Sequence, residues 1–76
     1  MNKARRKALQ SILDRLEELK DTLETLQEEE EEYRENMPEN LWGGEKYEAS
    51  EGATSSMDDA ASSLEDAISS IEAVIE

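Results

Sequence analysis

The residues of this chain that could do chemistry are mostly carboxylates, and they concentrate in a run of five glutamates at residues 28–32. Carboxylates three and four residues apart on a helix lie roughly 6 Å from one another, close to the spacing of phosphates along a nucleic-acid strand. Such a ridge could act as a nucleic-acid mimic in a channel lined by Lys and Arg, with a salt-sensitive affinity. The alternative is a solvated helix face without a partner.

Two further features bear on this choice. Glu30 occupies a position of the apolar repeat where leucine would stabilise a helix pair, which favours a function for the run. Trp42 follows in a turn, and it either closes the turn in a cluster with Tyr33 and Tyr47 or anchors a partner. We therefore predict a partner-binding surface made of the following residues: Glu24, Glu28, Glu29, Glu31, Glu32, Glu35, Leu41 and Trp42.

The side-chain inventory argues against catalysis. The chain has no cysteine and no histidine, which removes disulfides, thiolate metal sites and the commonest general base. No nucleophile has a base positioned by the pattern. The acidic pairs at 58–59 and 65–66 lack a loop that would supply converging oxygens for a hard cation. We expect a non-enzyme with no catalytic site, no cofactor and no metal site.

Charge narrows the choice of partner. The chain has 21 acidic and eight basic residues, for a net charge of −13. Residues 1–20 hold six of the bases and three acids, whereas residues 21–76 hold two bases and eighteen acids. Such a surface repels nucleic acid and anionic membranes and attracts cationic proteins. No apolar run suits a membrane span or a signal peptide. We expect a cytoplasmic protein that binds a basic protein, not nucleic acid or membrane.

Helices must position these carboxylates. Apolar residues step by three and four along the first half: Leu9, Ile12, Leu16, Leu19, Leu23 and Leu26. The pattern continues through Glu30 and Tyr33 to Met37 and is widened by Leu13, which predicts a helix over about residues 3–36. Pro38 should end it. The segment 37–44 is rich in Pro and Gly and predicts a turn, with one short helical turn begun by Pro38.

The second half repeats every seven residues, at 55–61, 62–68 and 69–75, with a serine pair, an apolar residue, acids and a small or apolar pair in register. A seven-residue period is typical of a helix that packs on another helix. We expect a second helix over about residues 45–76. Its first part is weakened by Gly52, which costs about 1 kcal/mol relative to Ala, and Thr54 or Ser55 could instead cap a shorter helix.

The two patterns match in phase when the chain folds back between Leu41 and Trp42, which would place Leu26 opposite Met57 and Leu9 opposite Val74. The sequence thus predicts an all-α single domain over 1–76, with two long antiparallel helices in a hairpin or coiled coil. Further apolar residues widen this seam: Leu13, Ala61, Ile68 and Ile75. Surplus apolar surface on a small chain indicates another contact, either in a homodimeric four-helix bundle or with a different protein.

The segment 36–41, Asn-Met-Pro-Glu-Asn-Leu, resembles the turn of small acidic helical proteins encoded by phages and mobile elements of bacteria. Those proteins are similar in a basic start, a Glu-rich first helix, an N-[ML]-P-E-[NS]-L turn, and a second helix of the Leu-Glu-Asp-Ala-Ile type found here at 64–68. The chain departs from the pattern at 49–56, where Glu and Ala would be more frequent. The family has no agreed activity to transfer to particular residues.

The resemblance implies a phage-type protein in the host cytoplasm, and small acidic phage proteins are often inhibitors, including anti-CRISPR and other anti-defence proteins. We therefore expect an inhibitor or adaptor that binds a basic host or phage protein. The alternatives are a structural homodimeric bundle and an assembly or scaffolding factor for virion proteins.

Overall fold

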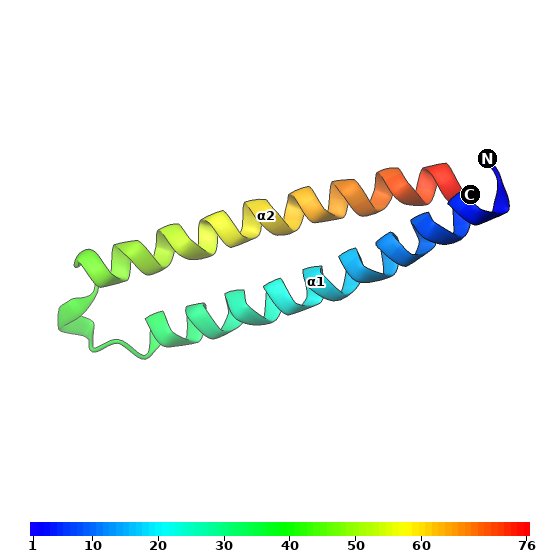
Figure 1. Ribbon diagram of the computed structural model, residues 1–76. Coiled ribbons are helices and arrows are strands. Elements are labelled where there is room, and N and C mark those ends of the chain that lie inside the picture. The colour runs from blue at the N-terminus through cyan, green and yellow to red at the C-terminus, as the bar shows by residue number, and fades with distance from the viewer.

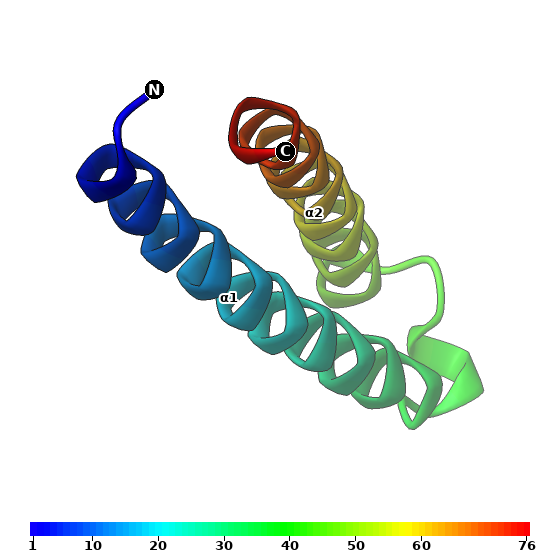
Figure 2. The same cartoon turned by 90° about the vertical axis from the view of Figure 1, so that its right-hand side faces the viewer.

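Two long antiparallel helices make up nearly the whole chain in the computed structural model, which describes all 76 residues. The elements are α1 (Lys3–Glu35), the 3-10 turn η1 (Glu39–Leu41) and α2 (Glu45–Ile75). Figures 1 and 2 show α1 and α2 side by side, with both termini at one end and the connection at the other. The Cα positions extend over 60 × 14 × 14 Å. The predicted helical hairpin is confirmed.

Local signals explain the ends of α1. Asn2 caps its start, because the Asn2 side-chain oxygen accepts a hydrogen bond from the backbone N–H of Arg5 at 2.8 Å. Such a cap satisfies one of the amides that a helix start leaves without a partner. The helix ends at Glu35, shortly before Pro38, which disfavours helical geometry in the residue that precedes it.

The connection between the helices is short and turns sharply. Residues Glu39–Leu41 form the small helical turn expected after Pro38, whose carbonyl accepts from the Leu41 N–H at 2.9 Å. Gly43 then adopts a φ of +85°, the left-handed region that favours glycine. Gly44 has no side chain to cap α2, but Glu45 and Glu48 in the first turn suit the positive end of the helix dipole.

Helix α2 runs without a break through the segment that its sequence left in doubt. Gly52, Thr54 and Ser55 all lie inside Glu45–Ile75, so the alternative of a shorter helix capped near Thr54 is wrong. Ser50 and Thr54 are buried against α1. Packing of this kind, more than intrinsic propensity, stabilises helices in proteins, and it accounts for the continuity across Gly52.

The stripe that α1 presents to α2 differs from the prediction. The residues expected in the seam, Ile12, Leu19 and Leu26, remain 45%, 59% and 48% exposed. The buried apolar side chains are instead the ones assigned to the margin, together with a turn residue: Leu13, Ala61, Ile68 and Met37. Two packed helices contact each other along one narrow strip of each helix. On α1 this strip lies between Leu9, Leu16 and Leu23 on one side and, on the other, the row that begins at Leu13 and repeats every seven residues.

Candidate protein-interaction surfaces

The five consecutive glutamates do not form one ridge. Each residue of a helix is turned by about 100° from the one before it, so the run winds around α1. Glu30 and Glu31 are half-buried beside α2, whereas Glu28, Glu32 and Glu35 are exposed at the spacing of one helix face. We call these last three residues the acidic face. Glu29 is also exposed, but it lies on the flank of α1 between the acidic face and the stripe of Leu19 and Leu26.

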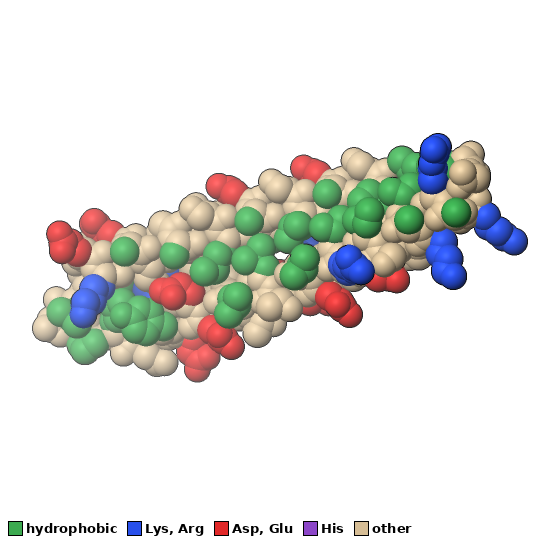
Figure 3. All heavy atoms as spheres, in the orientation of Figure 1, with side chains coloured by type: hydrophobic (Ala, Val, Ile, Leu, Met, Phe, Trp, Pro, Cys, Tyr) green, Lys and Arg blue, Asp and Glu red, His purple; other side chains and the backbone are tan.

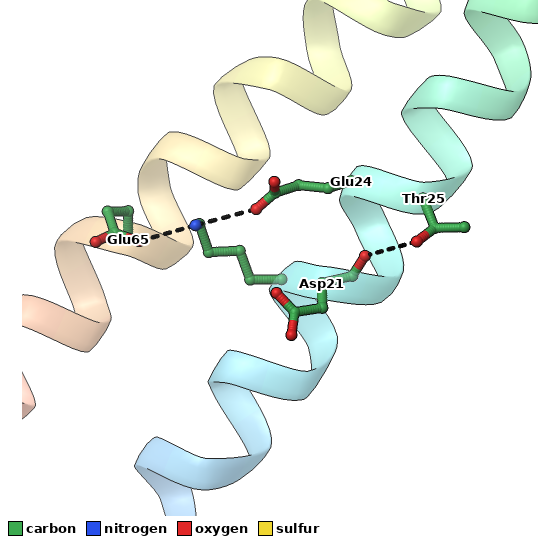
Figure 4. Close-up of polar contacts among 5 residues, drawn as sticks. Asp21, Glu24, Thr25 and Glu65 are labelled. Atoms are coloured by element: carbon green, nitrogen blue, oxygen red, sulfur yellow. Dashed lines mark hydrogen bonds and ion pairs between the residues drawn. The ribbon is translucent and has the colours of Figure 1, made fainter.

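Glu24, another predicted binding residue, belongs to an ion-pair cluster. Lys20 reaches from α1 towards α2, and its Nζ lies 3.0 Å from Glu24 Oε1 and 3.0 Å from Glu65 Oε2 (Figure 4). In the same turn the Thr25 hydroxyl donates to the backbone carbonyl of Asp21 at 3.1 Å. Glu24 is therefore already paired within the hairpin, which weakens its case as a partner-binding residue.

The hydrogen bonds from Lys20 to Glu24 and Glu65 raise the pKa of the lysine above its usual 10.5. Because the pKa of Lys20 is higher in the folded state than in the unfolded state, the ion pairs stabilise the hairpin fully at a pH below the unfolded-state pKa. This stabilisation is lost as the pH rises through the folded-state pKa. The pairs are therefore complete at neutral pH. Glu24 and Glu65 are exposed and Lys20 is partly exposed, and solvent-exposed pairs of this kind contribute little to stability.

Arg34 forms a second link between the helices that the sequence pattern did not indicate. Its Nη1 donates to Thr54 Oγ1 at 2.9 Å and lies 3.4 Å from Ser50 Oγ. The guanidinium carbon is 6.0 Å from the centre of the Tyr47 ring, a distance at which a cation is attracted to an aromatic face. Arg34 is the one base within 21–35, and it is directed to the buried hydroxyls of α2.

The aromatic side chains at the turn pack together, and Trp42 also stays partly exposed. Trp42 donates from Nε1 to the Met37 carbonyl at 2.9 Å, and its ring lies 6.0 Å from that of Tyr47, which fixes its position over the buried Met37. Trp42 and Leu41 are nevertheless each 49% exposed. An open hollow of about 360 Å³ lies beside them and is lined by Tyr33, Asn36, Met37, Pro38, Leu41 and Lys46.

The predicted binding residues are therefore only partly brought together. Glu32 and Glu35 occupy the last turns of α1, next to the turn that carries Leu41 and Trp42. Glu28 lies on the same face of α1, one turn closer to the N-terminus than Glu32. Glu24 and Glu31 lie on the side that meets α2. The best-formed candidate surface is thus the acidic face together with Leu41 and Trp42.

A second surface, the apolar face, follows from the stripe left outside the seam. On α1 it contains Ile12, Leu19, Leu26 and Tyr33, which are 45–59% exposed. On α2 it contains Ala60, Ala67 and Val74, and the partly exposed Leu16, Leu23, Leu64 and Ile71 lie between the two rows. Figure 3 shows hydrophobic side chains as a band along the line between the helices.

Two further observations concern membrane and metal binding. Neither helix has a stretch long and apolar enough to cross a membrane. No group of three or more acidic side chains is placed to hold a metal ion. Comparison of the chain with protein-family models, curated proteins and solved structures finds no match.

Proposed function

We propose that this chain is a non-catalytic interaction protein that binds a basic, nucleic-acid-binding surface of another protein. The observation that carries the proposal is that the carboxylates of the acidic face have no cation within the molecule. Lys20 forms the only ion pairs of the hairpin, with Glu24 and Glu65. Glu28, Glu32 and Glu35 are exposed and free to pair with a partner.

The neighbouring turn supplies an exposed aromatic side chain, which can contribute the binding energy that exposed carboxylates alone do not. Ion pairs between exposed charges speed and orient association more than they strengthen it. Tryptophan is among the residues that most often dominate binding energy, and Trp42 is anchored by its hydrogen bond to Met37 while about half of it remains exposed. A partner with a Lys- and Arg-lined groove beside an apolar pocket would fit both features.

The resemblance to small acidic proteins of phages and mobile elements favours inhibition over other outcomes of such binding. A protein that occupies the nucleic-acid site of a host factor blocks that factor, as an anti-CRISPR or other anti-defence protein does. On this proposal the chain acts in the host cytoplasm as a nucleic-acid mimic. It competes with nucleic acid for its partner and does not bind nucleic acid itself.

The test is capture from a bacterial lysate with four immobilised forms of the protein. Wild type is compared with the acidic-face variant Glu28→Gln/Glu32→Gln/Glu35→Gln and with Trp42→Ala. The control, Asp59→Asn/Asp66→Asn/Glu72→Gln, removes the same number of exposed charges from α2. We expect wild type and control to retain a basic nucleic-acid-binding protein and added double-stranded DNA or RNA to release it.

We expect the other two variants to retain about tenfold less of that protein, because a loss of about 1.4 kcal/mol at a binding hot spot has this effect. Equal capture by all four forms would show that neither the acidic face nor Trp42 takes part. Capture that nucleic acid does not reverse would contradict the mimic and leave an adaptor or assembly role.

A further inference from the structure

We propose that a second copy of this chain covers the apolar face, with the two hairpins antiparallel in a four-helix bundle. The turn of each hairpin would then lie beside the termini of the other. This proposal concerns a different surface from the acidic face and does not depend on the proposed function.

The hairpin alone has too small a hydrophobic core for a stable domain. Only six of the 76 residues are buried, and two of these are Ser50 and Thr54. A core of this size rarely stabilises a small domain that lacks disulfides or metals. The apolar side chains that would complete a core are present but exposed, and they repeat every seven residues at Ile12, Leu19, Leu26 and Tyr33.

The heptad positions that remain exposed are those that a four-helix bundle would bury. In a four-helix bundle two stripes of each helix point to the common centre, and the flanking stripes pack against the two neighbouring helices. In this hairpin α1 and α2 already meet through one flank each, at Leu13 and at Ala61 and Ile68. The opposite flank of α2 carries small side chains at Ser56, Ser63 and Ser70, which would let another helix approach closely.

The available area is also sufficient. A face of 60 by 14 Å between Cα positions covers roughly 800 Å², which is about what each partner contributes to a stable protein–protein interface. A contact along the whole hairpin therefore reaches the usual size, whereas an end-to-end contact would not.

Charge decides the orientation. Residues 1–20 hold six bases and three acids, and residues 21–35 hold one base and eight acids. A parallel pair of hairpins would bring the two acidic ends together, where like charges repel. The antiparallel pair places the bases at positions 3, 5, 6 and 7 of one copy alongside the acidic end of α1 in the other copy.

The two helices agree on one position for the two-fold axis. An axis beside Leu19, at the middle of α1, would pair Leu19 with its own copy, Ile12 with Leu26 and Arg5 with Tyr33. Lys20 contacts Glu65, so Leu64 lies on α2 within about one helical turn of the height of Leu19. The same axis would then pair Leu64 with its own copy and Met57 with Ile71. The α1 row of the apolar face and the α2 residues Met57, Leu64 and Ile71 are thus each self-complementary about nearly the same axis.

The first test is the mass in solution. Sedimentation equilibrium of the wild-type chain should give twice the chain mass of 8.6 kDa. Leu19→Glu should shift the protein to the monomer, because it puts a charge at the centre of the apolar face. Ser11→Glu, at an exposed position away from that face, should remain dimeric. Wild type that stays monomeric and helical at high concentration would overturn the proposal.

The second test is orientation. The chain has no cysteine, so single spin labels can be attached at Asn40→Cys in the turn or at Asp21→Cys near the proposed axis, both exposed positions. In the antiparallel dimer the labels at 40 should be separated by about the 60 Å length of the hairpin. The two labels at 21 should be offset from each other by only roughly 6 Å along the direction of the helices. Short distances at both positions would mean a parallel dimer and would contradict the proposed arrangement.

Discussion

At the scale of single residues, the most informative contact is the one that Arg34 makes across the helices. A polar layer in a seam stabilises less than leucine would, but it specifies which residues face each other. Arg34 reaches Thr54 and Ser50, and the Thr54 hydroxyl is also close to the backbone carbonyls of Ser50 and Glu51. The guanidinium thus donates hydrogen bonds to two buried hydroxyls in the region where Gly52 weakens α2.

This contact predicts the effect of Arg34→Met. The change keeps an apolar stem but removes the donor, and hydrogen bonds to a charged group contribute roughly 1.5–3 kcal/mol. We expect urea unfolding followed by circular dichroism to show a loss of about 1–2 kcal/mol. Arg15→Met makes the same replacement at an exposed position and should change stability by less than about 0.5 kcal/mol. Equal losses would mean that charge, and not the contact with Thr54, is responsible.

At the scale of elements, the sequence predicted the helices and the turn because their signals are local. Pro38 and the two glycines at 43 and 44 end one helix and begin the other, whatever the helices pack against. The stripe that faces the neighbour is not a local property. In a two-helix contact and in a four-helix bundle, different positions of the same heptad make the closest contact between neighbouring helices. The prediction therefore put Leu19 in the seam where the hairpin has Lys20.

The candidate site shows the same division. The exposed carboxylates and the turn residues Leu41 and Trp42 could be named from the sequence, because charge runs and turns are recognisable in a short stretch of residues. Which carboxylates remain free could not be, since this depends on Lys20 reaching Glu65 on the other helix. Arg34 was missed because an arginine within an acidic run gives no sign that it turns towards buried hydroxyls.

Two glycines of the hairpin should respond to alanine in opposite ways. A Cβ at Gly52 would meet nothing within 4 Å, so Gly52→Ala should raise the free energy of unfolding by about 1 kcal/mol through helix propensity. That gain corresponds to an increase in melting temperature of about 4–8 °C. Gly43→Ala also meets no atom, but its φ of +85° should cost about 1 kcal/mol. Thermal melts of the two variants check both signs, and a loss at Gly52 would contradict a continuous α2.

At the scale of the whole molecule, charge repulsion dominates the electrostatics. The net charge is −13, and the ion pairs within the hairpin involve only Lys20. Antiparallel pairing of two copies would offset part of the repulsion at the acidic end, but the assembly would still carry twice the charge of one chain. Added salt therefore has more repulsion to screen than attraction to weaken.

We accordingly expect sodium chloride to stabilise the fold. In urea, which carries no charge of its own, the unfolding midpoint should rise between 10 mM and 500 mM salt, because the Debye length falls from about 30 Å to a few ångströms over this range. Replacing all five glutamates at 28–32 by glutamine should raise the midpoint at low salt and reduce its dependence on salt, since the densest cluster of like charges is gone. A midpoint that falls as salt is added would mean that the attraction between the basic start of α1 and the acidic end of a second copy outweighs the repulsion. In that case the glutamine variant would be the less stable of the two at low salt, so the two measurements together identify which charges decide the stability of the molecule.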